Sequence, residues 1–163
     1  MNSLNLMSAF LLFTLWMVPK PVDVIPAEQF IRLQNYPTIT MKAGSSQTAI
    51  ASFKIGDGYH IMADRGEDSS LLFTQLEISG TDQIQLGDPQ FPEPKEYDLL
   101  GEEYRMMVFD ELMSVQIPVV VSQDTPEGSY TLQGKLFYQA CSQAKCYFRK
   151  ELTFQLTVTV VTG

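Results

Sequence analysis

Two cysteines are the residues of this sequence whose chemistry is most specific. Cys141 and Cys146 are separated by four residues, and the 163-residue sequence contains no other cysteine. Four intervening residues fit the loop of a β-hairpin, which sets the two cysteines opposite each other at the ends of its strands. Facing positions of antiparallel strands lie about 4.5–5.5 Å apart at Cα, a separation that a disulfide can bridge. The spacing therefore predicts a local disulfide at the end of a hairpin.

A disulfide of this kind is either a passive staple or a redox-active pair. Closing a loop of about six residues stabilises a protein by roughly 2 kcal/mol in the chain-entropy model, less than a long-range bridge would. A bridge at a loop tip adds little stability to a domain of this length, but it presents sulfur to a partner, so we favour the redox-active pair. Lys145, Arg149 and Lys150 lie close to Cys146 in the sequence. Nearby cations favour the attacking thiolate, although these three also fit ordinary solvated charge.

Composition argues against several other chemistries. The net charge of −8 would repel the phosphates of nucleic acid and the headgroups of anionic lipid. Two cysteines and one histidine are too few for a zinc site, which usually takes four ligands, so we expect no metal. Catalytic-triad chemistry would have to use His60, and the nucleophile-elbow motif is absent. Exchange between disulfides needs no cofactor, and we expect none.

Other residues near the cysteines in sequence or pattern have two interpretations each. His60 is expected to be a strand residue whose ring is packed, and the alternative places it near the cysteines, where it tunes a thiol. Tyr59 and Tyr138 are expected to be core or rim aromatics that shape the site. Met106 and Met107 fit packing better than soft-metal binding. A group of carboxylates is expected to form a solvated face: Glu102, Glu103, Asp110 and Glu111.

The elements that must position the cysteines are strands. Thr48–Ile55 places Ala49, Ala51 and Phe53 on one face, and from Lys20 onward the apolar period is two rather than 3.6. Further alternating or extended runs occupy residues 59–62, 72–78, 83–86, 115–121, 130–138 and 152–160. Many short strands with turns between them predict an all-β, immunoglobulin-like antiparallel β-sandwich.

Two interruptions in this pattern carry structural expectations. Pro118 lies within the run 115–121, which predicts an edge strand or a bulge because proline has no N–H for the ladder. Gly87 to Glu103 holds three prolines and two glycines. We interpret this stretch as a long loop, and long loops in compact domains are often functional.

The N-terminus carries an apolar run from Leu6 to Val18 without a charged residue. Its 13 residues are fewer than the about 20 of a membrane span, but they match the apolar region of a signal peptide. A buried N-terminal segment is the alternative. We expect residues 1–19 to be an export signal or an apolar N-terminal segment, and residues 20–163 to form a single domain. Export would place that domain in the periplasm or another compartment that permits disulfides, tethered to the membrane if the segment is retained.

The residues around the cysteines resemble a known family. Residues 136–141 read L-F-Y-Q-A-C and are followed after four residues by Cys146-Tyr147. This is similar to the cysteine motif of the N-terminal periplasmic domain of the DsbD thiol:disulfide interchange protein. Residues 55–61 also resemble the segment before that family's active-site strand, and the likeness extends over roughly residues 27–161.

The resemblance implies how the pair would work. A thioredoxin-like domain of a membrane electron-transfer protein would reduce the pair, which then passes electrons to a periplasmic disulfide isomerase or thiol protein. Cys146 would form the mixed disulfide and Cys141 would resolve it, with Tyr97 to Tyr104 as a mobile cap. The remaining residues expected to shape the site are Tyr59, His60, Tyr97, Tyr138, Lys145 and Tyr147. The sequence has no thioredoxin-like Cys-x-x-Cys motif, so the donor is expected to be a separate protein.

The two functions under consideration are therefore of different classes. The first is a protein-disulfide oxidoreductase component that exchanges disulfides through Cys141 and Cys146. The second is a non-enzymatic, immunoglobulin-like envelope binding domain whose disulfide is structural. Replacing both cysteines by serine separates them, because binding would survive that change and electron transfer would not.

Overall fold

The computed structural model describes residues 29–66, 72–98 and 105–161. The expected export signal or apolar segment, residues 1–19, and the expected start of the domain at Lys20 lie outside these residues. Within the described ranges the chain forms twelve strands, β1 to β12, and no helix. Consequently no helix in this part of the chain is long and apolar enough to cross a membrane. The all-β, immunoglobulin-like fold expected from the alternating pattern is confirmed.

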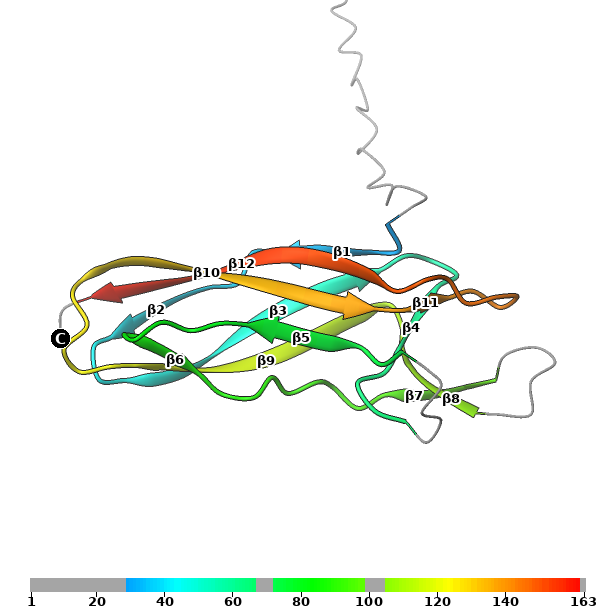
Figure 1. The fold of residues 1–163 in the computed structure, drawn as a ribbon, viewed down its shortest axis with the longest axis horizontal. Helices are drawn as coiled ribbons and strands as arrows, with labels where there is room; N and C mark the ends of the chain where they lie inside the picture. The colour runs from blue at the N-terminus through cyan, green and yellow to red at the C-terminus, as the bar shows by residue number, and fades with distance from the viewer. Residues whose placement is uncertain (1–28, 67–71, 99–104, 162–163) are drawn as a thin grey trace, which may run out of the picture.

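Two four-stranded sheets form the layers of the sandwich, and a third sheet lies at one end (Figure 1). The first sheet has the order β1 (Ile31–Asn35), β3 (Ser46–Ile55), β9 (Leu112–Val121), β6 (Ile84–Leu86). The second has the order β2 (Thr38–Lys42), β12 (Lys150–Val161), β10 (Gly128–Tyr138), β5 (Gln75–Ile78). The third has the order β11 (Ala140–Cys141), β4 (His60–Met62), β8 (Arg105–Phe109), β7 (Lys95–Asp98).

The core lies between the first two sheets and follows the alternation of the sequence. In β3 every second residue from Ala49 to Ile55 is buried, and the residues between them are partly or fully exposed. Strand β12 contributes its own alternate residues from the opposite layer. Phe53 of β3 meets Phe154 of β12 edge to face, with ring centroids 5.5 Å apart, a favourable aromatic geometry. The two layers are thus held by apolar burial.

The long hairpin of β10 and β12 carries the cysteines. Its strands pair without interruption from Gly128↔Val160 to Tyr138↔Lys150. Beyond Tyr138 the regular ladder ends, and β11 pairs with β4 of the third sheet on one side, while Cys141 still faces Cys146 of the hairpin on the other. Tyr138 is buried at this junction, and burial raises the pKa of its phenol to about 12. The hairpin therefore projects from the sandwich and is held at its far end by the third sheet (Figure 1).

One strand pairing departs from the expected antiparallel pattern. Strand β2 runs parallel to β12, with Thr38 opposite Thr157. The chain passes from β1 in the first sheet to β2 in the second through Tyr36-Pro37. Proline cannot donate a ladder hydrogen bond, whereas its carbonyl accepts one from the Thr157 amide at 3.0 Å. The proline thus lies where the chain changes sheets.

The prediction that Pro118 marks an edge strand or a bulge is wrong. Strand β9 lies between β3 and β6, and its register with β3 is continuous through Thr48↔Pro118. The carbonyl of Pro118 accepts a hydrogen bond from the Gly87 amide at 2.9 Å, just beyond the last residue of β6. The amide and carbonyl of one antiparallel residue point to the same neighbour, so the missing N–H faces the end of β6 rather than a continuing ladder.

The prediction of a long loop from Gly87 to Glu103 is wrong for part of its length. Lys95–Asp98 forms β7 and pairs with β8 in antiparallel register, Tyr97 opposite Met106. Opposite charges at diagonal cross-strand positions support this pairing. Arg105 lies opposite Asp98 and donates to the diagonal neighbour Glu96 at 3.0 Å. The prolines and charged residues of this stretch led to the prediction of a loop, but it contains a short strand that is partly exposed. Residues 99–103 lie outside the described ranges.

The fold predicts that substitutions on the two faces of β3 differ strongly in their effect on stability. Replacing the fully buried Phe53 by alanine should lower the free energy of unfolding by about 3–5 kcal/mol, because it leaves a cavity against Phe154. Replacing Ile50, which is half exposed on the opposite face, should cost less than about 1 kcal/mol. Chemical denaturation of both variants tests this. Equal losses would contradict the assignment of the core face.

Candidate functional site

The predicted local disulfide is present at the end of the hairpin. Cys141 and Cys146 are bonded through their sulfurs and their Cα atoms lie 3.9 Å apart. The intervening loop is closed by the amide of Ser142, which donates to the carbonyl of Lys145 at 2.9 Å. On the other side of the cysteines, the amide of Tyr147 donates to the carbonyl of Ala140 at 2.8 Å. These bonds extend the hairpin past the end of β10 and set the two cysteines face to face.

The two cysteines differ in exposure. Cys141 is 0% exposed, whereas Cys146 is partly exposed. Cys141 pairs on one side with Cys146 and on the other with β4, so it lies inside the third sheet while Cys146 lies at its border. An approaching thiol or disulfide therefore meets Cys146 first.

Apolar side chains from the third sheet cover the disulfide. Met62 of β4 and both Met106 and Val108 of β8 are buried together with Cys141, and Tyr97 of β7 packs against this group. The expectation that Met106 serves packing is confirmed by its burial. Methionine sulfur is polarisable and adapts to irregular surfaces, which suits a contact with a disulfide. The cover is thus built by strands that lie far from the cysteines in sequence.

The strand register sets four residues in one row across the third sheet. Cys146 pairs with Cys141, and Cys141 pairs with His60. Strands β4 and β8 continue the row, because Ile61↔Phe109 is a register pair and the next position sets Asp110 opposite His60. Directly opposed side chains share one face of a sheet. The row Cys146, Cys141, His60, Asp110 therefore occupies the face that carries the disulfide.

His60 is enclosed in this row. It is 4% exposed, and its ring packs against the Tyr97 ring at a tilt of 38°, with centroids 3.8 Å apart. Burial lowers the pKa of His60 below its ordinary value of 6.5, and the charge of Asp110 raises it in part. Its Nε2 is buried and has no hydrogen-bond partner among the described residues. His60 is thus a packed strand residue, as favoured from the sequence, and it also lies beside Cys141.

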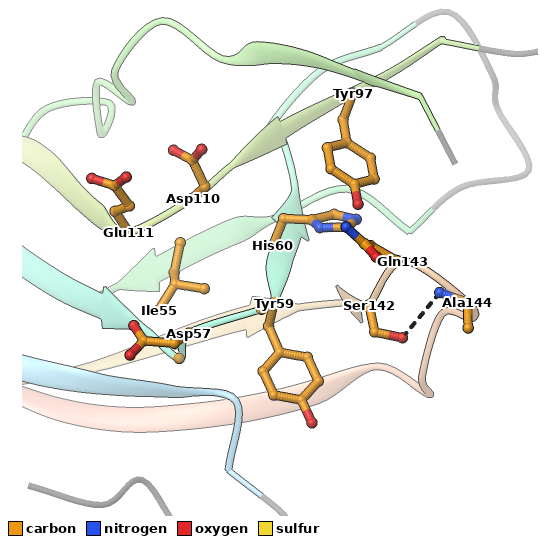
Figure 2. A pocket seen from close by; sticks show the side chains of 12 residues that line it. Ile55, Asp57, Tyr59, His60, Tyr97, Asp110, Glu111, Ser142, Gln143 and Ala144 are labelled. Atoms are coloured by element: carbon orange, nitrogen blue, oxygen red, sulfur yellow. Dashed lines mark hydrogen bonds between the residues drawn. The ribbon is translucent and has the colours of Figure 1, made fainter. Parts of the chain in front are cut away.

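A hollow of about 740 Å³ opens next to this row. Figure 2 shows Asp110 and Glu111 on one side of it, the Ser142–Ala144 tip on the other, and His60 between them beneath Tyr97. Asp110 also binds the ammonium of Lys95 at 2.7 Å, and this contact raises the pKa of Lys95. The hollow therefore combines an acidic wall with the exposed tip of the hairpin.

The other residues expected to shape the site support the hairpin from its opposite side. Tyr59 and Tyr147 pack with Phe30, with ring centroids 4.9 and 4.4 Å from Phe30, and Figure 2 shows Tyr59 directed away from His60. Tyr138 belongs to the main core. Lys145 is exposed and its ammonium lies 4.9 Å from the centre of the Tyr147 ring, a cation–π contact. Tyr59 also lines the hollow together with His60, although its ring points away from the His60 ring.

Three residues around the disulfide were not among the predicted site residues, and one of them, Asp110, was expected only on a solvated acidic face. Met62 and Val108 contact the buried cysteine group, and Asp110 stands in the row beside His60. One signal was available: Met62 lies two positions from His60, and Asp110 lies two positions from Val108, so each pair shares a face. The pairing of β4 with β8 could not be inferred from such alternation. The expected cap at Tyr97 to Tyr104 is described only at Tyr97 and Asp98; its other residues lie outside the described ranges.

The fold and the site together define a class: an immunoglobulin-like domain that carries a covered disulfide at the end of a hairpin. The family model described as thiol:disulfide interchange protein DsbD, N-terminal, matches residues 25–158. The chain belongs to this family. Thiol–disulfide exchange is the chemistry of the family, and a bonded cysteine pair is the group that such exchange requires.

Solved structures similar to this chain include the N-terminal domains of two proteins, DsbD and ScsB. The N-terminal domain of DsbD from Neisseria meningitidis, in the reduced form, is 21% identical, with 72% of this chain and 82% of that chain covered and a TM-score of 0.46. The N-terminal periplasmic domain of ScsB from Proteus mirabilis is 15% identical, with 77% and 44% covered and a TM-score of 0.48. This chain thus spans less than half of the ScsB chain. A comparison with curated proteins found no match.

The cover predicts how fast the disulfide is reduced. Replacing Tyr97 by alanine removes the ring that packs over His60 and the disulfide. Loss of an aromatic contact of about 0.5–1.5 kcal/mol should raise the rate of reduction by dithiothreitol about two- to tenfold. Tyr36, which is largely exposed and belongs to no buried cluster of the described residues, provides the matched control. Equal rates for Tyr97→Ala and Tyr36→Ala would show that Tyr97 does not shield the pair.

Proposed function

We propose that this domain is a thiol–disulfide exchange module that passes electrons through Cys141 and Cys146. The observation that supports it best is the unequal exposure of the two cysteines, with Cys141 buried and Cys146 at the border of the sheet. Exchange proceeds through a mixed disulfide, which requires one accessible sulfur to bond the partner and a second sulfur held next to it. A hairpin that fixes both cysteines at facing positions meets that requirement without a cofactor.

In the proposed reaction Cys146 acts first. The reduced pair presents Cys146 as a thiolate, which attacks one sulfur of a partner disulfide and releases the other partner sulfur as a thiolate. Cys141 then attacks Cys146, forms the intramolecular disulfide and releases the second partner sulfur. The pair loses two electrons and the partner gains two. Reduction of the pair by a dithiol donor follows the same steps in reverse.

Local charge supports Cys146 as the attacking sulfur. Lys145 precedes it and is exposed beside the Tyr147 ring. Arg149 lies three residues beyond it and donates to Gln75 at 2.7 Å. Both cations belong to the short segment that holds Cys146, and positive charge near a thiol favours its thiolate. Tyr97 belongs to the cover of the pair, and in the proposed function it is part of a cap that must move when a partner docks.

The proposed partners follow from the family to which the chain belongs. A thioredoxin-like domain of a membrane electron-transfer protein would supply electrons, and a disulfide isomerase or other thiol protein would receive them. We place residues 20–163 as one domain in the periplasm or another exported location, with residues 1–19 as its export signal or membrane tether. Such a compartment permits disulfides to form.

A binding domain with a structural disulfide is the second candidate. The complete burial of Cys141 favours it, because a sealed disulfide resists reduction. In that function the hollow beside the hairpin would receive a partner without covalent chemistry. The two candidates differ in whether the partner becomes bonded to sulfur.

A trapping experiment distinguishes the two candidates. Cys141→Ser leaves Cys146 without its resolving sulfur, so a mixed disulfide with a partner should accumulate and survive non-reducing electrophoresis. Cys146→Ser is the matched control, and it should trap far less because its remaining cysteine is buried. Accumulation through Cys141 instead would reverse the assigned roles. Trapping through neither cysteine would favour the binding domain.

The reduction potential provides an independent measurement. Equilibration with glutathione should give a value above about −300 mV, since structural disulfides in exported proteins usually lie below that value. The sample is the wild-type chain, and the fraction oxidised is followed by thiol alkylation and mass. A pair that glutathione cannot reduce at any accessible ratio would identify a structural bridge.

A further inference from the structure

His60 is a buried titratable side chain that the proposed exchange does not yet use. It is 4% exposed, and its Nε2 has no hydrogen-bond partner among the described residues. Leaving a buried polar atom without a partner costs free energy, so folded proteins rarely do so without a reason. Figure 2 shows the ring between Tyr97 and the Ser142–Ala144 tip, at the hollow that both line.

The geometry of the row places His60 beside the resolving sulfur. His60 and Cys141 are directly paired residues of β4 and β11, and Cys146 pairs with Cys141 from the other side. Met62, two residues beyond His60, packs in the same cluster as Cys141. Alternate residues of a strand share a face, so the imidazole lies on the same face as the Cys141 sulfur.

Resolution of the mixed disulfide poses a proton problem at Cys141. Its sulfur must become a thiolate to attack Cys146. Met62 and Val108 surround Cys141 with apolar groups, and apolar surroundings disfavour the charged form of an acid. A neutral base next to the thiol removes this obstacle, because the proton moves a short distance and need not reach bulk water.

We propose that His60 accepts the proton of the Cys141 thiol during resolution, and that the carboxylate of Asp110 stabilises the resulting imidazolium. The inference rests on the proposed function. Cys141 loses its proton to His60 and bonds to the sulfur of Cys146, while the bond between Cys146 and the partner sulfur breaks. The departing partner thiolate takes up the proton from the imidazolium. Two electrons leave the cysteine pair and reduce the partner.

The charges around His60 suit a base that is neutral before it acts. Asp110 and Glu111 face the hollow from the turn between β8 and β9, Tyr97 packs against the imidazole from β7, and Lys95 is bound to Asp110. Burial lowers the pKa of His60 below 6.5, so the imidazole is mainly neutral at about pH 7. The charge of Asp110 acts in the opposite direction, which reduces the cost of the imidazolium.

The test separates the two chemical steps in the reduced full chain. Ellman's disulfide releases one coloured thiolate when Cys146 attacks and a second when Cys141 resolves, and stopped-flow absorbance follows both. In the wild type the rate of the second phase should not change with pH above the pKa of His60. There the proton passes from the Cys141 thiol to His60, and the fraction of molecules in the thiolate–imidazolium form does not depend on pH. In His60→Gln the second phase should be at least about tenfold slower at about pH 7 and rise with pH as the free thiol ionises. The first phase should not change.

Two matched variants separate proton transfer from structure. Asp110→Asn removes the carboxylate charge and should slow the second phase, though less than His60→Gln does. Lys95→Met breaks the same ion pair but keeps the carboxylate and leaves its charge without the neutralising ammonium, so the second phase should be at least as fast as in the wild type. Thermal unfolding of each variant shows whether a loss of packing accompanies the kinetic change.

Several results of this experiment would contradict the role proposed for His60. A second phase in His60→Gln with the wild-type rate and pH profile overturns the role of His60. If His60→Gln does not fold, an Asp110→Asn chain that resolves at the wild-type rate overturns it instead. If the wild-type chain releases no coloured thiolate at all, both the proposed exchange and this inference are overturned. If the wild type shows both phases and the variants resolve at the same rate, only the inference is overturned.

Discussion

The passage of one hairpin from its own sheet to another is the constraint on which the site depends. Strands β10 and β12 form a long, regular ladder, and its alternate apolar residues anchor it in the sandwich core. Past Tyr138 the hairpin continues as far as Cys141 opposite Cys146, but its outer neighbour changes from β5 to β4. A free hairpin tip would fray, because isolated two-stranded ribbons are marginally stable in water. Pairing with β4 holds the tip, buries Cys141 and leaves Cys146 at the border, so one change of partner strand creates both the rigidity and the asymmetry of the pair.

The third sheet both holds the hairpin and covers its disulfide. Its short strands β4, β7 and β8 supply the methionines, the valine and the tyrosine around the cysteines. Surface ion pairs such as Glu96 with Arg105 contribute about 0–1 kcal/mol each, so the outer part of this sheet is held mainly by backbone pairing and by the contact of the Tyr97 ring with His60. Elements of low local stability are the ones that open most readily. A cover with these properties shields the disulfide and still yields to a docking partner.

His60 connects the cover to the disulfide. Its ring packs against Tyr97 of the cover, and its backbone pairs with Cys141 of the disulfide. Displacement of Tyr97 would expose the imidazole to water and change the balance between its charged and neutral forms, because burial is the main cause of its lowered pKa. The wall of Asp110 and Glu111 adds negative charge to the same hollow. Packing and electrostatics at this site therefore act through the same few side chains.

The strand faces and the local disulfide could be predicted from the sequence, because alternation along a strand and the spacing of two cysteines are short-range properties, and the family followed from the motif around those cysteines. The alternation in β3 and β12 reveals the buried face wherever one side of a sheet is solvated, and four residues between cysteines suffice to predict a hairpin loop. The pairing of the strands, in contrast, became visible only in the folded domain. Pro118 lies inside a sheet because β6 ends beside it, and Lys95–Asp98 is a strand because β8 lies alongside. The row from Cys146 to Asp110 joins segments about fifty to eighty residues apart, and such pairing depends on the packing of the whole chain rather than on local pattern.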